Sequence, residues 1–114
     1  MTYPELIEAV KKLGFREKRT DLSEYLEFVI QRDRVNELSP ILERFFGPPI
    51  KPAGEPPSNK TQKHTAAYGG VRTDQTLYLV EDDTVSNCAI LWPWNDGQLV
   101  TVKIAQDQKS AFRA

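Results

Sequence analysis

The sequence has little of what most functional sites are built from. It contains one cysteine, Cys88, and one histidine, His64. A single cysteine cannot form an internal disulfide, which fits a reducing compartment. The usual His and Cys spacing of a metal site is missing, and one imidazole excludes any mechanism that needs two within one subunit. The sequence therefore predicts no metal site and no cofactor.

Neither an excess of charge nor a long apolar run is present. Lys and Arg number 15 against 16 Asp and Glu, which gives a formal net charge of -1 at pH 7. No apolar stretch approaches the roughly 20 residues that cross a bilayer. The first residues lack the basic and apolar regions of a signal peptide. We therefore expect a cytoplasmic protein that binds neither nucleic acid nor membrane.

Helical patterns dominate the first part of the chain, which at 114 residues has the length of a single domain. Thr2 with Glu5, and Asp21 with Glu24, form capping-box patterns ahead of apolar residues at helical spacing. A third apolar stripe follows the dipeptide Ser39-Pro40 and stops before Gly47. Three helices are thus predicted within the helical part, residues 1–46: from residue 2 to 13, from 21 to about 33, and from 39 to 46.

Proline interrupts the chain after these helices. Residues 47–64 hold five of the eight prolines and have no apolar period, which predicts a linker or surface arm. Such an arm either packs along the surface or swaps onto a neighbouring subunit. At the other end, residues 107–114 are polar apart from Phe112, so this tail is expected to fray.

A β-hairpin is predicted within Val85–Gln106. The loop residues 95–97, Asn-Asp-Gly, lie between two runs rich in β-branched and aromatic residues. A three-residue loop would set Trp92 opposite Val100 and give one almost wholly apolar face. A loop one residue shorter would pair Ile90 with Lys103 instead. The three-residue loop is therefore the predicted register.

Two further segments complete the predicted sheet over residues 65–106. Residues 65–71 form a weak candidate strand broken by two glycines, and residues 75–81 a better one that leads into the acidic turn 81–84. In this pairing Leu77 opposes Cys88, on the same apolar face as the hairpin. The predicted fold is α+β, with three N-terminal helices packed on one face of a three- to four-stranded antiparallel β-meander.

Trp92 and Trp94 are the most prominent candidate contact residues. They either cover the core against the helices or form an aromatic corner open to a partner. Tyr68 and His64 are the other two candidates, and His64 is chosen because its pKa in water lies near neutrality. Cys88 is expected to be a buried, inert thiol, and the acidic turn to keep a hairpin soluble rather than to bind a cation.

Three functions follow from these residues. The favoured one is a non-catalytic protein-interaction or accessory-subunit module that self-associates as a homodimer. The alternative is a small-ligand-binding domain, with a pocket between helices and sheet and with Trp92, Trp94 and Tyr68 around its mouth. The third is a small enzyme that uses His64 with Asp74 or with a carboxylate of the acidic turn. No motif identifies the partner or ligand.

Overall fold

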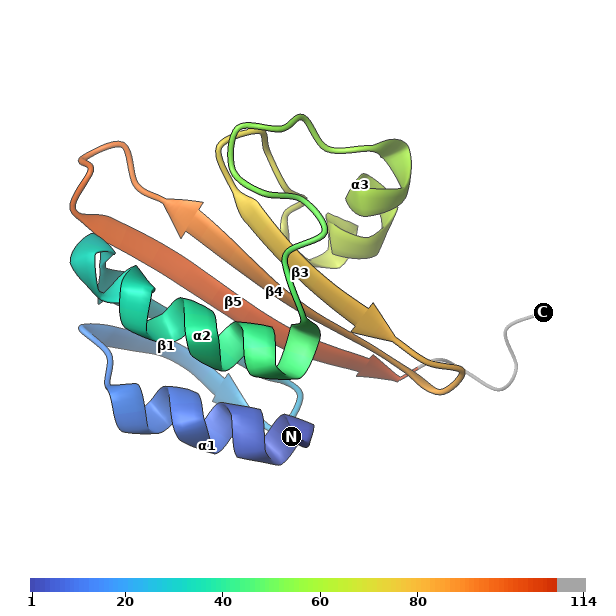
Figure 1. Cartoon of the computed structure of the whole chain (residues 1–114), viewed down its shortest axis with the longest axis horizontal. Helices are drawn as coiled ribbons and strands as arrows, with labels where there is room; N and C mark the ends of the chain where they lie inside the picture. Colours follow the sequence, from blue (N-terminus) through green and yellow to red (C-terminus); the bar gives the residue numbers. More distant parts are fainter. Residues whose placement is uncertain (109–114) are drawn as a thin grey trace.

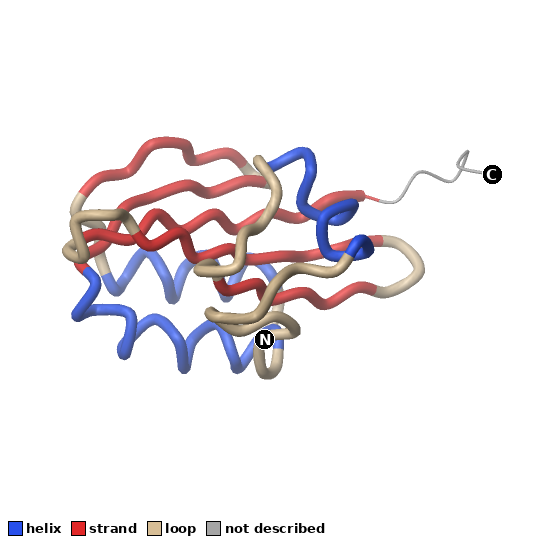
Figure 2. The backbone as a smooth tube through the Cα atoms, turned by 90° about the horizontal axis from the view of Figure 1, so that it is seen from above, coloured by secondary structure: helices blue, strands red, loops and turns tan. Residues whose placement is uncertain are grey.

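The fold is a five-stranded antiparallel sheet with helices on both faces. The computed structural model describes residues 1–108. The strands lie in the order β1-β2-β5-β4-β3. Helices α1 and α2 cover one face, here the helix face, and α3 lies over part of the other, the second face (Figures 1 and 2). In chain order the elements are α1 (Tyr3–Leu13), β1 (Glu17–Leu22), β2 (Tyr25–Gln31), α2 (Val35–Phe46), α3 (Asn59–Thr65), β3 (Thr76–Glu81), β4 (Val85–Pro93) and β5 (Leu99–Gln108).

The α+β class and the antiparallel sheet expected from the sequence are confirmed. The sheet has five strands rather than three or four, and two helices rather than three precede residue 47. Strand β5 extends to Gln108, so the first two residues of the expected tail belong to the sheet. The expected fraying of residues 109–114 lies outside the described residues.

Helix α1 begins and ends where the sequence predicts. The Oγ1 atom of Thr2 accepts a hydrogen bond from the Glu5 N–H (3.2 Å), and the Glu5 carboxylate accepts one from the Thr2 N–H (2.8 Å). This capping box satisfies two backbone donors that the first turn leaves free. Gly14 ends the helix with a positive φ of 91°, a conformation that favours glycine.

The second predicted helix is wrong, because its residues form the β1–β2 hairpin. Leu22 pairs with Tyr25 across a two-residue turn. Asp21 does not cap a helix: its carboxylate lies 2.8 Å from the ammonium of Lys11 and 3.3 Å from that of Lys18, and these contacts lower its pKa. Strand β2 buries residues on both faces, so its apolar residues fitted a helical period as well as a strand.

The third predicted helix exists, but it starts earlier than expected. A 3₁₀ turn, η1 (Arg32–Arg34), leads directly into α2. Pro40 therefore lies inside the helix and not at its first residue. It is exposed and removes one backbone hydrogen bond on the solvent side. The buried stripe begins one turn earlier, at Leu38, and the helix ends at Gly47 as predicted.

The β4–β5 hairpin is confirmed, but its predicted register is wrong. Ile90 lies opposite Lys103, the pairing that the sequence analysis rejected. The loop is not shorter than expected but longer. It contains four residues, 95–98, because the Trp94 N–H donates to the Leu99 carbonyl (2.9 Å). Relative to the predicted register β5 is displaced by one residue, so each of its side chains lies on the face opposite to the predicted one.

Asp96 closes this longer loop. Its Oδ1 atom accepts hydrogen bonds from the N–H groups of Gln98 (2.8 Å) and Leu99 (3.2 Å), the usual way in which an Asp side chain stabilises a turn. The three-residue loop was predicted on the assumption that only one face of the sheet is buried. The central strands are covered on both faces, so that assumption does not hold.

The β3–β4 hairpin has a different register from the predicted one, but its apolar side chains lie on the same face as one another, as predicted. Leu77 pairs with Ile90, two residues away from the predicted partner, so both side chains still share a face. Asp82 closes the acidic turn: its Oδ1 atom accepts hydrogen bonds from the N–H groups of Thr84 (2.7 Å) and Val85 (2.9 Å). These bonds give the acidic turn a structural role.

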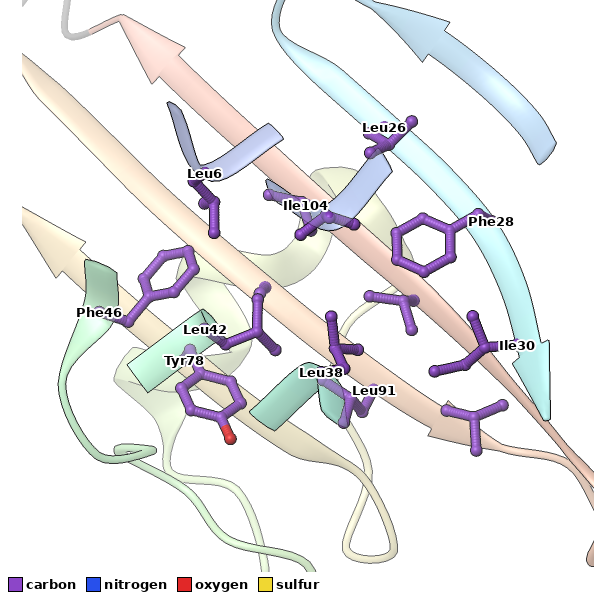
Figure 3. Packing of buried hydrophobic residues seen from close by; sticks show 14 of the residues in the cluster. Leu6, Leu26, Phe28, Ile30, Leu38, Leu42, Phe46, Tyr78, Leu91 and Ile104 are labelled. Atoms are coloured by element: carbon purple, nitrogen blue, oxygen red, sulfur yellow. The ribbon is translucent and has the colours of Figure 1, made fainter. Parts of the chain in front are cut away.

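The main core fills the space between the two helices and the helix face (Figure 3). Its fully buried side chains come from both helices and from four strands. Burial of each large aliphatic or aromatic side chain contributes about 1.5–3 kcal/mol. The principal members are Leu6, Val10, Leu26, Phe28, Ile30, Leu38, Leu42, Tyr78, Ala89, Leu91, Val100, Val102 and Ile104.

A smaller core lies on the second face, beneath α3. Residues 65–71 are not the expected strand: they form the end of α3, the 3₁₀ turn η2 (Ala66–Tyr68) and a glycine pair. Ser58 caps α3 by accepting a hydrogen bond from the Thr61 N–H (3.1 Å). The buried members of this second core are Val71, Leu77, Cys88, Ile90 and Ala105.

The proline-rich arm, residues 47–58, is docked on the edge of β3. The last six residues of the segment expected as an arm belong instead to α3. Lys51 and Leu77 exchange backbone hydrogen bonds (3.3 Å and 2.9 Å), which form an isolated antiparallel bridge. Prolines on both sides of this bridge prevent a longer ladder, because they have no N–H to donate.

Lys51 also fixes the arm through its side chain. The residue is only 3% exposed, and its ammonium donates to the carbonyls of Pro52 (3.0 Å), Thr73 (3.1 Å) and Gln75. These acceptors match the three N–H donors of an ammonium. Burial lowers the pKa of Lys51. One charged side chain therefore ties the arm to the segment that leads into β3.

We expect Lys51→Met to lower the free energy of unfolding by about 2 kcal/mol, because it leaves buried carbonyls without their donor. Urea unfolding followed by circular dichroism measures this loss. Lys60→Met changes an exposed lysine on α3 and serves as the control, with an expected change within about 0.5 kcal/mol. Equal midpoints for the two variants would contradict a stabilising role for Lys51.

Candidate functional site

The second face of the sheet carries the candidate site, because α3 covers only part of it (Figure 2). Beyond α3, side chains from four strands and from the loop before β3 form a continuous set of rings and charges. We call this set the aromatic–cation face. It consists of Glu17, Arg19, Tyr25, Glu27, Tyr68, Arg72, Trp92, Trp94, Thr101 and Lys103.

Trp94 is the large apolar side chain that this face exposes most. It follows β4, and its side chain is turned across the sheet. The indole N–H donates to the Oγ1 atom of Thr101 on β5 (2.8 Å), and the Arg19 guanidinium from β1 lies 5.6 Å from the indole centroid. Trp94 nevertheless stays 36% exposed. A partly exposed, hydrogen-bonded indole of this kind is typical of contact surfaces.

Trp92 lies between two cations, and its buried indole N–H has no hydrogen-bond partner among the described residues. The ammonium of Lys103 lies 3.6 Å from the indole centroid, and the guanidinium of Arg72 lies 5.7 Å from it. A Cβ atom on Gly69 would come within 3.1 Å of the ring, so a larger residue there would displace it. Lys103 also donates to the Tyr68 carbonyl (2.9 Å), and burial lowers its pKa. These contacts hold the ring and both cations in place.

A polar cluster lies at the β1–β2 side of the same face. The Tyr25 hydroxyl donates to the Glu27 carboxylate (2.6 Å), and burial and this bond raise the pKa of Tyr25. The Tyr25 ring stacks on Tyr68, with centroids 5.8 Å apart. Arg19 lies 2.7 Å from the Glu17 carboxylate and 3.7 Å from that of Glu27. The cluster thus gathers tyrosine, arginine and glutamate, with the tyrosine kept protonated.

The structure brings together three of the four candidate residues. Trp92, Trp94 and Tyr68 belong to the aromatic–cation face, whereas His64 lies on α3 and lines a small cavity that Tyr68 also lines. The expectation that the tryptophans cover the core against the N-terminal helices is wrong, because their contacts lie on the face opposite α1 and α2.

Sequence reasoning missed the charged members of the site. The three charged side chains from the N-terminal hairpin, Glu17, Arg19 and Glu27, come together because β1 and β2 pair. The period-two alternation of Tyr25, Glu27 and Val29 was the available signal, since it places these residues on one face of a strand. This alternation was overlooked because the same segment was predicted to form a helix.

The cavity at His64 is small, and the thiol that lines it is unreactive at neutral pH. It has a volume of about 150 Å³, below the roughly 300–1,000 Å³ of typical ligand sites. Cys88 lines it, and burial raises the pKa of this thiol to about 12, so the thiolate is scarce at neutral pH. Asp74, the proposed partner of His64, lines a different depression, whereas Glu81 of the acidic turn lines this cavity.

The sequence also led to expectations about a metal site and about a small-ligand pocket. Within residues 1–108, no group of three or more His, Cys, Asp and Glu side chains is placed to hold a metal ion. The expected small-ligand pocket had Trp92, Trp94 and Tyr68 around its mouth, but these residues contact the second face. A groove of about 730 Å³ lies elsewhere, between α1 and the β1–β2 turn, and Leu22 lines it. Small-ligand binding stays a prediction.

No protein-family model, curated protein or solved structure matches the chain. Among the described residues, no helix is both long enough and apolar enough to span a membrane. The cytoplasmic location stays a prediction.

The burial of Cys88 leads to a direct chemical test. We expect the native thiol to react slowly with an aromatic disulfide reagent up to about pH 10, because its raised pKa keeps it protonated. In urea the reaction should be fast and should rise through the ordinary thiol pKa, near 8.5. Cys88→Ala carrying Ser23→Cys places a thiol in an exposed turn as the reactive control. Labelling of native Cys88 as fast as this control would show that the thiol is accessible.

Proposed function

We propose that the chain is a non-catalytic protein-interaction module that pairs with a second copy of itself through the aromatic–cation face. The observation that carries this proposal is the partly exposed indole of Trp94 on a sheet face that α3 leaves open. The helix face, in contrast, is filled by the main core. Aromatic residues with few rotamers supply contact energy at low entropic cost.

The edges of the sheet are poorer surfaces for association. Strand β1, the outer strand on one side, reads EKRTDL and has a register irregularity between Lys18 and Thr20. Charged residues and bulges are the devices by which proteins prevent edge pairing. The other outer strand, β3, is bridged at Leu77 by Lys51 of the arm. These features favour association of two copies through a face of the sheet rather than through an outer strand.

The distribution of charge on the aromatic–cation face suits a second copy. Arg72 lies over Trp92 at the β4 side of the face. Lys103, which also contacts this ring, lies on β5 opposite Glu27 of β2. Glu17 and Glu27 lie at the β1–β2 end, with Arg19 between them. A two-fold axis that lies in the plane of the interface, parallel to the strands, places Arg72 of one copy over the β1 end of the other, where Glu17 lies. The face is therefore self-complementary, as an isologous interface requires.

Trp94→Ala tests this proposal. We expect the dimer dissociation constant to rise at least 30-fold, since a central aromatic contact contributes about 2 kcal/mol or more. The loss of folding stability should stay near 1–2 kcal/mol, below the range for a fully buried aromatic residue, because the side chain is partly exposed. Sedimentation velocity over a concentration series, with thermal unfolding of the same samples, measures both quantities.

Ile50→Ala is the matched control, because Ile50 is an exposed apolar residue on the arm, outside the aromatic–cation face. It should leave the dissociation constant unchanged. A wild-type protein that stays monomeric, or a destabilised Trp94→Ala variant of unaltered mass, would defeat the proposal.

A further inference from the structure

We infer that Arg72 of one copy forms an ion pair with Glu17 of the second copy, and that this pair sets the orientation of the dimer. The inference rests on the self-association proposed above.

Arg72 is a cation placed for such a contact. It is exposed, and its guanidinium lies over Trp92. Within residues 1–108 it forms no ion pair, whereas Arg19 and Arg34 each contact a carboxylate at 2.7 Å. Its backbone N–H is fixed by the Gln75 side chain (2.8 Å). A guanidinium held at its base and on an aromatic ring loses little entropy when a carboxylate binds it.

Glu17 is the accessible carboxylate at the opposite end. Its side chain is 57% exposed, and one of its oxygens contacts Arg19. A carboxylate accepts several hydrogen bonds, so a second guanidinium is accommodated without breaking the first contact. Glu27 is the less suitable acceptor. Its side chain is only 20% exposed, and it already accepts the Tyr25 hydroxyl.

The strand order gives the geometry of the pairing. Trp92 lies on β4 and Glu17 on β1, and β5 and β2 separate these strands. Three strand spacings of about 4.8 Å put the two ends roughly 14 Å apart. The midpoint falls between β5 and β2, the region that Trp94 spans by contacting Thr101 and Arg19. A two-fold axis at this midpoint, in the plane of the interface and parallel to the strands, brings the two Trp94 rings together and places Arg72 over Glu17 in both halves.

Charge reversal tests this pair. We expect Arg72→Glu and Glu17→Arg each to raise the dimer dissociation constant at least tenfold, because each sets like charges against one another. The double variant restores the opposite charges in exchanged positions and should return the constant to within about threefold of the wild type. Sedimentation velocity at low salt measures each constant, and high salt should reduce the differences.

Arg32→Glu is the control, because Arg32 is an exposed arginine at the hairpin end, outside the aromatic–cation face. It should leave the constant unchanged. Single reversals without effect, or a double variant as weak as the singles, would overturn the ion pair. If Trp94→Ala still dissociated the dimer in that case, the proposed self-association would stand. A monomeric wild type would overturn both proposals and leave the face to a different protein.

Discussion

The position of β5 between β2 and β4 is the constraint on which the rest of the structure depends. Its even-numbered side chains Val100, Val102 and Ile104 lie in the main core, whereas Lys103 faces the other way, over Trp92. A displacement of one residue would exchange the two sets. The hydrogen bonds of Asp96 at the hairpin loop therefore have consequences across the whole sheet. They determine which residues meet the helices and which form the aromatic–cation face.

Local signals in the sequence predicted the parts of the fold that depend on local interactions. The capping box at Thr2 and the glycine stop at Gly47 were found because a few neighbouring residues suffice to form them. The β1–β2 hairpin was missed because its second strand is buried on both faces, so the apolar residues at its end mask the alternation at its start. The register of β5 was missed for a related reason. Once α3 covers the second face, an apolar residue is satisfied on either side.

The candidate site shows the same division between residues that local sequence signals identify and residues that only long-range strand pairing brings together. Trp92 and Trp94 were identified because large aromatics near a strand end stand out in any sequence. Their partners Arg19 and Glu27 were not, since they are distant in sequence and reach the site only through the pairing of β1, β2 and β5. His64 was chosen for its chemistry alone, and the structure places it in a small cavity where, of the other candidates, it meets only Tyr68.

The pairing of β2 with β5 also sets the order in which the protein assembles. It joins Tyr25–Gln31 to a strand that begins only at Leu99, so the chain must close a loop of more than sixty residues before this ladder forms. During synthesis the earlier elements emerge first, and Leu26 and Phe28 lack their β5 partners until the end. Non-local contacts of this kind slow folding. Strand β5 therefore completes the main core once it pairs with β2.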